Sequence, residues 1–288
     1  MTTSRSDASA PMVEDWAGIR GERWLADLDR FEAMLAPVGE ALIARAGFQP
    51  GEQVADIGAG GGWTTRRIAR LVAPGGEATG IDISPALVAE AQRRADAEGL
   101  ANCRFVLGDA GSADGLGLPA FDRLASRYGV MFFPDPPAGF AGLARRLKAG
   151  GRLDIAVWAE PRDNPWMMEI RNRVAAHVEV PKPEPLAPGP FQLGNRGYLD
   201  ELLAGAGFAD IRIEALAHQV PVGGPGASPA EAADFALGSL AFADLLDGCD
   251  PAVREACRAD LEAFYAGRAT AEGVLMPAMS WLVSAVRA

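Results

Sequence analysis

The stretch Val54-Ala55-Asp56-Ile57-Gly58-Ala59-Gly60-Gly61-Gly62-Trp63-Thr64-Thr65 decides the fold of this chain. Residues 53–57 read as a short buried strand, and residues 64–72 have the apolar spacing of a helix. The glycine-rich turn between them lets backbone N–H groups and a helix N-terminus approach a ligand closely. Asp56 falls at the carboxyl end of the strand, where open α/β sheets bind their ligands.

The turn differs from a dinucleotide-binding fingerprint at Trp63, because that motif has a third small residue at the corresponding position. The bulky ring argues against pyrophosphate geometry. The turn therefore favours a different nucleoside ligand.

A regular alternation of strands and helices follows the turn. We expect strands at 77–81, 102–107, 121–125 and 152–158, with a glycine turn at 148–151 before the last. The intervening helices are expected from Ser84-Pro85 to about 98, with Ser84 as cap, and at 138–147. This alternation predicts a parallel sheet with helices on both faces, a doubly wound α/β fold.

Helical spacing also precedes the sheet. Trp24, Leu28, Phe31 and Leu35 recur at helical intervals, Pro37 is expected to open a second short helix, and Gly47 is a plausible C-cap. Two interpretations of Trp16 and Trp24 stay open, because such rings either pack on the core or form a lid over a cofactor.

Composition limits the classes of function. The 288 residues carry a formal net charge of −11, which disfavours nucleic acid as a partner. No stretch is apolar for long enough to span a bilayer, and residues 1–7 are polar, so we expect a cytoplasmic protein. The three cysteines have no metal-ligand or disulfide spacing, and no metal site is expected.

Acidic residues end the first three expected strands, namely Asp56, Asp82 and Asp109. An acid after the second strand suits the two hydroxyls of a ribose. An acid after the third can accept a hydrogen bond from an exocyclic amine such as that of adenine. Together they favour an adenosine-containing ligand.

Four motifs carry a resemblance to a known family. They are Asp56-Ile57-Gly58-Ala59-Gly60-Gly61-Gly62, Gly80-Ile81-Asp82-Ile83-Ser84, Gly108-Asp109-Ala110 and Leu147-Lys148-Ala149-Gly150-Gly151-Arg152-Leu153. The chain resembles class I S-adenosylmethionine-dependent methyltransferases, and within them the ubiquinone/menaquinone-biosynthesis group, often called methyltransferase type 11. The similarity covers residues 53–158 and is recognisable again at 197–214.

The resemblance implies the cofactor S-adenosyl-L-methionine and assigns roles around it. The turn with Gly58, Ala59, Gly60 and Gly62, following Asp56, would hold the methionyl part, and Asp82 would hold the ribose. Asp109 and Ala110 would frame the adenine, with Ile83 packed against its ring. Ser126 and Arg127 would lie beside the cofactor.

Domain organisation follows from the same comparison. We expect a Rossmann-like seven-stranded sheet with helical cap insertions, and a last strand inserted antiparallel between the fifth and sixth. The expected parts are an N-terminal helical cap or lid (1–48), the cofactor-binding core (49–160), a cap insertion (161–197), a core helix and sixth strand (198–218), a helical cap insertion (219–279) and the last core strand (280–288).

The catalytic residues cannot be named from the sequence. Trp158, Trp166, Met167, Met168, Phe191 and Met276 are candidates to line a substrate cavity, with ordinary packing as the alternative. His177 and His218 are weak candidates for a general base. Asp135-Pro136-Pro137-Ala138 echoes a motif of amide and adenine N-methyltransferases, but it lacks the aromatic residue and reads as a helix start.

The sequence thus predicts methyl transfer to a small-molecule oxygen, nitrogen or carbon acceptor that is apolar or aromatic. Two alternatives remain, a non-catalytic protein that binds the cofactor and a nicotinamide-dependent oxidoreductase. A homodimer is left open.

Overall fold

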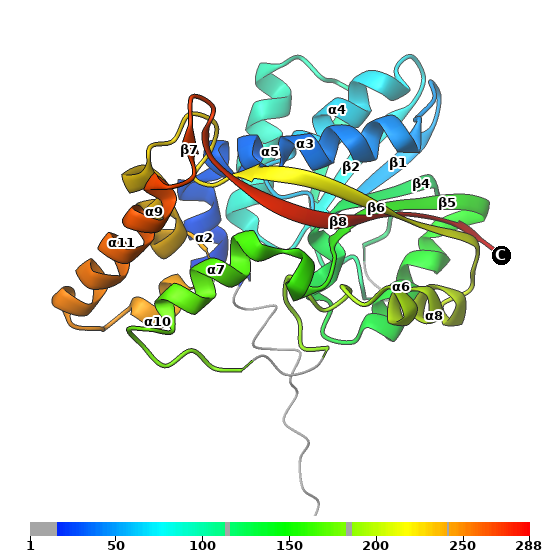
Figure 1. The fold of residues 1–288 in the computed structure, drawn as a ribbon. Helices are drawn as coiled ribbons and strands as arrows, with labels where there is room; N and C mark the ends of the chain where they lie inside the picture. The colour runs from blue at the N-terminus through cyan, green and yellow to red at the C-terminus, as the bar shows by residue number, and fades with distance from the viewer. Residues whose placement is uncertain (1–15, 113–115, 183–185, 241) are drawn as a thin grey trace, which may run out of the picture.

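The computed structural model describes residues 16–112, 116–182, 186–240 and 242–288. Residues 1–15, which include the polar N-terminus and the start of the expected helical cap, lie outside them. Seven strands form one twisted sheet in the order β3-β2-β1-β4-β5-β8-β6 (Figure 1). They are β1 (Gln53–Ile57), β2 (Glu77–Asp82), β3 (Cys103–Leu107), β4 (Phe121–Arg127), β5 (Leu147–Trp158), β6 (Phe208–Pro221) and β8 (Gly273–Arg287).

Strands β1 to β5 pair in parallel, whereas β8 lies antiparallel between β5 and β6. The short β7 (Ala269–Thr270) pairs with the start of β8. The predicted doubly wound α/β class and the insertion of the last strand are therefore confirmed.

Helices cover both faces of the sheet. In Figure 1, α3 (Leu28–Ala46), α4 (Trp63–Val72) and α5 (Pro85–Ala97) lie above it, and α6 (Pro136–Arg146) and α8 (Arg196–Gly205) lie below. Two helix starts were predicted from local signals. Oγ of Ser84 accepts from the backbone N–H of Leu87, and the Asp135 carboxylate accepts from that of Ala138 at 2.9 Å, so both residues are N-caps.

The prediction for Pro37 was wrong. Residues 28–46 form one continuous helix, and Pro37 lies inside it. Proline removes one helical hydrogen bond. However, buried side chains on both sides of it, Met34 and Leu35 before and Val38 and Leu42 after, pack into the main core and hold the helix together. Its end is as predicted, because Gly47 adopts φ 61° there.

Three strands are longer than the sequence indicates. The expected turn at 148–151 belongs to β5, where the pairing with β4 shifts register between Phe121 and Arg123. Strand β6 continues to Pro221 and β8 begins at Gly273, because residues 215–221 pair with residues 275–281. Local sequence does not show this pairing, which joins segments far apart in the chain.

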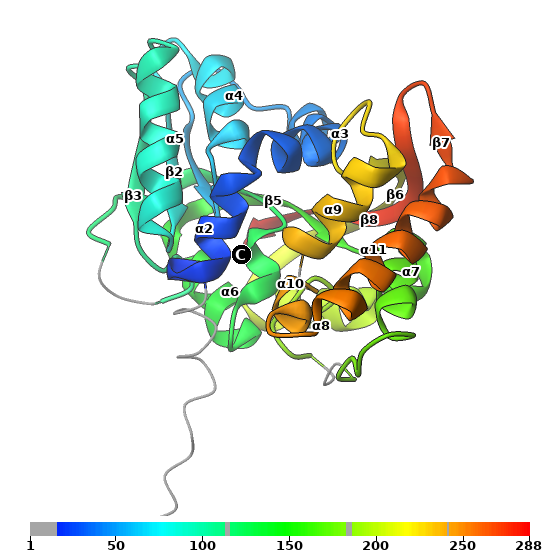
Figure 2. The same ribbon diagram turned by 90° about the vertical axis from the view of Figure 1, so that its left-hand side faces the viewer.

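Further helices lie outside these two layers. These are α2 (Ile19–Ala26), α7 (Pro165–Val174), α9 (Pro229–Gly238), α10 (Ala243–Leu246) and α11 (Pro251–Ala266), with short 3₁₀ turns η1 (Gly129–Phe132) and η2 (Pro161–Asp163). Figures 1 and 2 show α2, α7, α9, α10 and α11 gathered at one end of the sheet. None of the described helices combines the length and hydropathy needed to cross a bilayer.

Candidate active site

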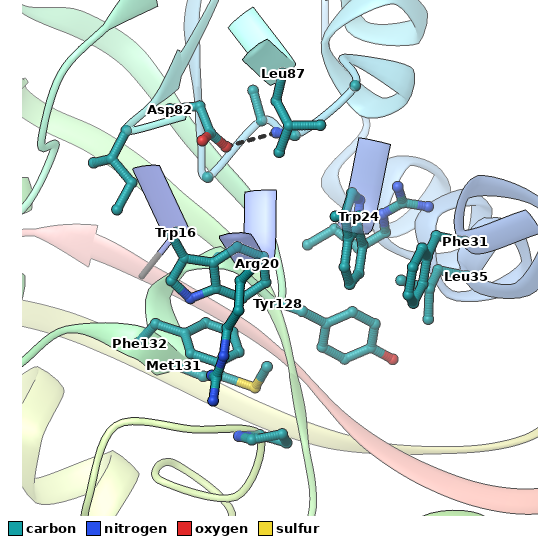
Figure 3. Close-up of a pocket in the computed structure, with 18 of the residues that line it drawn as sticks. Trp16, Arg20, Trp24, Phe31, Leu35, Asp82, Leu87, Tyr128, Met131 and Phe132 are labelled. Carbon is teal, nitrogen blue, oxygen red and sulfur yellow. Dashed lines mark hydrogen bonds between the residues drawn. The ribbon is translucent and has the colours of Figure 1, made fainter. Parts of the chain in front are cut away.

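A cavity of about 260 Å³ lies where the carboxyl ends of the strands meet the cap helices. Its sheet side is formed by the residues that follow β1, β2, β3, β4 and β5. Its cap side is formed by residues of α2, α3 and α7 and by Ser239, Leu240, Phe242 and Asp244. Figure 3 shows Trp16, Trp24 and Phe31 of the N-terminal segment on one side of this space, with Asp82, at the end of β2, and Tyr128, after β4, on the other sides.

The glycine turn brings three strands into backbone contact. Gly58 adopts φ 67°, and a Cβ added to it would lie 2.6 Å from Cα of Gly129, after β4. Its N–H donates to the carbonyl of Ile81 on β2 at 2.9 Å. Gly62 is the left-handed N-cap of α4, where a Cβ would lie 2.5 Å from the ring of Phe105. Only glycine satisfies both the dihedral angle and the close approach at these two positions.

Asp82 is fixed by backbone donors at the end of β2. Its Oδ2 accepts from the N–H of Gly60 at 2.8 Å (Figure 3). Its Oδ1 accepts from the N–H of Ser84 at 2.9 Å. Burial raises the pKa of Asp82, while the backbone N–H groups of Ser84, Gly60 and Ile83 act in the opposite direction. A carboxylate held in this way keeps lone pairs for further donors.

The loop after β3 forms the next part of the wall. Gly108, Asp109, Ala110 and Ile83 line the cavity there. Oδ1 of Asp109 accepts from the N–H of Gly111 at 2.8 Å. Arg146 on α6 donates to the carbonyl of Ala110 at 3.2 Å, which ties this loop to the lower helical layer.

Eight of the eleven predicted cofactor residues line the cavity: Gly58, Ala59, Gly60, Asp82, Ile83, Asp109, Ala110 and Arg127. The other three, Asp56, Gly62 and Ser126, lie behind this wall in the described structure. Ser126 donates to the carbonyl of Ile57 at 2.7 Å and accepts from the N–H of Gly129, so it joins β4 to the turn.

Asp56 lies beneath the glycine turn, only 2% exposed. Oδ2 of Asp56 accepts from the hydroxyl of Thr65 at 2.6 Å. Burial raises the pKa of Asp56 from about 3.8 to about 6, against the effects of Thr65 and Arg127. Asp56 therefore joins the end of β1 to α4 through Thr65, and its carboxylate favours the charged form of Arg127.

The cap side of the cavity is rich in aromatic rings. Trp16 meets Phe132 edge-on at 5.1 Å and Trp24 at 5.8 Å, and Trp24 stacks on Phe31 at 3.7 Å between centroids. Of the predicted substrate-cavity residues, Trp158, Trp166 and Met167 line the wall. Met168, Phe191 and Met276 are not among the described lining residues, and Met276 is buried in the core.

Neither histidine reaches the cavity wall in the described part of the chain. Nε2 of His177 lies 3.4 Å from Asp260, between the end of α7 and α11. Nε2 of His218 lies 3.1 Å from Oγ of Ser280, and that oxygen lies 2.8 Å from the hydroxyl of Tyr128. Among the described residues, no group of three or more His, Cys, Asp or Glu is placed to hold a metal ion.

Several lining residues were not predicted from the sequence, notably Glu32, Tyr128 and Phe132. Glu32 had a usable signal, because it falls within the apolar stripe of α3 formed by Leu28, Phe31 and Leu35. A carboxylate in that stripe must be buried, which is costly unless it has partners. Phe132 had no comparable signal.

Comparisons with known proteins agree with this geometry. A family described as "Methyltransferase domain" matches residues 54–151. Nocamycin O-methyltransferase from Saccharothrix syringae is 30% identical over 186 residues, which cover 61% of this chain and 66% of that protein. Aklanonic acid methyltransferase DauC from Streptomyces sp. (strain C5) is 35% identical over 117 residues, 41% of this chain and 53% of that protein. The chain thus spans between half and two thirds of the length of these two relatives.

Solved structures share the fold. Phosphoethanolamine N-methyltransferase 2 from Haemonchus contortus, solved in complex with S-adenosyl-L-methionine, aligns with a TM-score of 0.57 and 18% identity. That alignment covers 99% of this chain and 60% of the other. The glycine turn, the acids that end the strands and these comparisons together identify residues 54–151 as a methyltransferase domain of the class I, S-adenosylmethionine-dependent type.

Proposed function

We propose that this protein transfers a methyl group from S-adenosyl-L-methionine to a small-molecule acceptor with an apolar or aromatic body, at oxygen, nitrogen or carbon. One observation carries the proposal: the glycine turn and Asp82 share a single cavity with the aromatic cap residues. A nucleoside cofactor and an apolar acceptor can therefore meet inside the protein. The names of the relatives, an O-methyltransferase of nocamycin and a methyltransferase of aklanonic acid, support an acceptor of this kind.

The wall of the cavity fits the cofactor. In our proposal Asp82 accepts from the ribose hydroxyls, Asp109 and Ala110 border the adenine, and Ile83 packs on its face. Gly58, Ala59 and Gly60 face the methionyl part and Arg127 lies beside it, while Asp56, Gly62 and Ser126 support the turn from behind. When bound, the cofactor supplies a sulfonium methyl group, and the protein contributes position and the exclusion of water.

The wall also suggests which acceptors can react. No histidine lines the described part of the cavity, and Tyr128 is held by Ser280. Burial raises the pKa of Tyr128, so its hydroxyl keeps its proton. We therefore propose acceptors that reach the site already ionised or with a free lone pair, such as a carboxylate, an enolate or an amine.

We further propose that α2 and the start of α3 act as a lid. Trp16, Trp24 and Arg23 line the cavity, and Arg23 forms ion pairs with Asp244, which also lines it, and with Asp247. Asp27 accepts from the hydroxyl of Ser239 beside these pairs. The lid therefore joins the N-terminal segment to the cap insertion that follows β6.

A turnover assay tests the proposal. S-adenosylmethionine is incubated with the protein and a library of phenols, enols, carboxylic acids and amines, and S-adenosylhomocysteine formation is measured. Turnover with at least one apolar acceptor is expected. Calorimetric binding of the cofactor without any turnover would favour the non-catalytic alternative, and tight binding of NADH instead would favour the oxidoreductase. Trp63 argues against the latter, because a dinucleotide-binding turn needs a small residue at this position, the start of α4.

Two finer proposals remain. The motifs quoted above support membership of the ubiquinone/menaquinone-biosynthesis (type 11) group.

The 14-residue edge strand β6 offers unpaired backbone groups to a second copy, which supports a homodimer. Sedimentation analysis across a concentration series tests the second point.

A further inference from the structure

A continuous line of hydrogen-bonding groups leads from the cavity to the outer strand of the sheet. It begins at Tyr128, which follows β4 and lines the cavity (Figure 3). The hydroxyl of Tyr128 lies 2.8 Å from Oγ of Ser280 on β8, and that oxygen lies 3.1 Å from Nε2 of His218 on β6. Tyr128 and Ser280 are buried, whereas His218, on an edge strand, is partly exposed. The line therefore joins the cavity to a ring that solvent reaches.

The fold fixes the three side chains relative to one another. Leu216 pairs with Ser280 in the antiparallel ladder, so His218 lies diagonally opposite Ser280 on the same face of the sheet. Tyr128 adopts φ 68°, a left-handed conformation that costs free energy in a residue other than glycine and persists only where the surroundings impose it. Trp158 stacks on the ring of Tyr128 at 4.3 Å and on that of His218 at 5.6 Å. The packing thus holds both ends of the line in place.

The hydrogen bonds along the line can share one direction. Burial lowers the pKa of His218, and a backbone hydrogen bond with Gln219 acts in the opposite direction. Because Nε2 faces Ser280, Nδ1 is the ring nitrogen left to donate to Gln219, and a neutral imidazole then carries its lone pair on Nε2. Ser280 can donate to that lone pair while it accepts from the hydroxyl of Tyr128. Every donor then points from the cavity towards His218.

We propose that Tyr128, Ser280 and His218 form a proton relay that takes the proton from an amine acceptor during methyl transfer. The inference rests on the proposed function and adds the route by which the proton leaves. The amine nitrogen bonds to the methyl carbon, and the carbon–sulfur bond breaks with its electron pair going to sulfur. The N–H proton passes to Oη of Tyr128, the proton of Tyr128 to Oγ of Ser280, and the proton of Ser280 to Nε2 of His218.

The relay agrees with the burial of its members. Each hydroxyl receives one proton as it gives one, so the buried Tyr128 never has to ionise. Tyr128 contacts the acceptor, whereas Ser280 and His218 act through it, and His218 returns the proton to solvent. A carboxylate acceptor holds no proton on its attacking oxygen and does not need this route.

Steady-state assays of the full chain with two probe acceptors test the relay. 1-Aminonaphthalene holds protons on its nitrogen, whereas 1-naphthoate attacks through an ionised oxygen. We expect Ser280→Ala to lower kcat for 1-aminonaphthalene about tenfold or more, with KM nearly unchanged, and to alter kcat for 1-naphthoate less than about threefold. The matched control is Ser284→Ala, which removes another buried hydroxyl from the same strand and should alter neither rate. Similar losses with both acceptors in Ser280→Ala would overturn the inference, because they indicate a structural role.

Nuclear magnetic resonance of the histidine rings tests the relay without any acceptor. The chain contains two histidines, so His177→Asn assigns the signals of His218. At neutral pH we expect Nε2 of His218 to be unprotonated, with nitrogen shifts that move in Ser280→Ala and stay in Ser284→Ala. A proton on Nε2 overturns the inference, because His218 could not then accept one from Ser280. Turnover of neither probe by the wild-type protein would count against the proposed function, whereas the protonation of Nε2 tests the relay in either case.

Discussion

The backbone N–H of Gly60 donates to Oδ2 of Asp82 at 2.8 Å, which ties the glycine turn after β1 to the acid that ends β2. The same carboxylate receives the N–H of Ser84, the residue that caps α5. Two elements that would hold different parts of one cofactor are thus joined through a single side chain. Changes at Asp82 should affect binding of the nucleoside more than the fold of the sheet.

Asp82→Ala should weaken S-adenosylhomocysteine binding about tenfold or more, because it removes the charged acceptor proposed for two ribose hydroxyls. The matched control is Glu77→Ala, which removes an exposed acid at the opposite end of the same strand. Calorimetric titration of both variants gives the comparison. A loss below roughly threefold for Asp82→Ala would count against its assignment to the ribose.

Gly58→Ala tests the close approach at the turn. The new Cβ would meet Cα of Gly129 at 2.6 Å, and φ is already 67°. Gly99→Ala is the matched control, because Gly99 has nearly the same dihedral angle, φ 68°, with nothing within 4 Å of an added Cβ.

Both glycine variants carry the left-handed strain of about 1–2 kcal/mol. Gly58→Ala should lose about 1–3 kcal/mol more in the free energy of unfolding, because backbone must move. Urea unfolding of the two variants measures the difference. Equal losses of unfolding free energy in the two variants would mean that the backbone near Gly129 moves away from the new Cβ at little energetic cost.

Much of the sheet could be predicted because its signals are local. The caps at Ser84, Asp135 and Gly47 depend on residues within one helical turn. Residues at the carboxyl ends of parallel strands share one edge by topology, and this places Asp82 and Asp109 together without any knowledge of side-chain contacts.

The remaining features depend on contacts between distant segments. The ring of Trp16 meets Phe132, more than a hundred residues later, and Arg23 pairs with Asp244. The prediction that a new helix begins at Pro37 was wrong, because core packing keeps the helix continuous through a residue that breaks helices locally. The long ends of β6 and β8 are strands only because they pair with each other. The sequence of either segment alone therefore does not predict this pairing.

Asp56 should make stability depend on pH with an unusual sign. Because burial raises its pKa from about 3.8 to about 6, the folded state binds the proton more tightly than the unfolded state does. Ionised Asp56 therefore opposes folding above pH 6, by about 3 kcal/mol. This cost falls away as the pH drops from 6 towards 4.

The variant Asp56→Asn isolates that effect. Its gain in unfolding free energy over wild type should be larger at pH 7.5 than at pH 5, by about 1–1.5 kcal/mol. Asp122→Asn is the control of opposite sign. Although partial burial acts against them, Lys148 and the N–H of Gln53 lower the pKa of Asp122. The stability that ionised Asp122 provides is lost as the pH falls. A pH-independent difference for Asp56→Asn would contradict the assignment.

The lid is best tested by side-chain variants. Deleting residues 1–36 would remove Phe31, Met34 and Leu35, which are buried in the main core, so that truncation would disturb the fold as well as the lid. Arg23→Met removes the ion pairs to Asp244 and Asp247 while keeping most of the aliphatic chain. Exposed ion pairs contribute only about 0–1 kcal/mol each, so the change should loosen the lid and leave the protein folded.

Release of S-adenosylhomocysteine from Arg23→Met should be about two- to fivefold faster than from wild type, as expected for about 0.4–1 kcal/mol. Stopped-flow tryptophan fluorescence can follow it, because Trp16 and Trp24 line the cavity. Added salt should speed release from wild type and leave the variant nearly unchanged, since salt screens exposed pairs. Arg258→Met is the control, because its pairs with Glu255 and Glu262 lie within α11. Identical release rates for wild type and Arg23→Met would show that these ion pairs do not hold a lid closed.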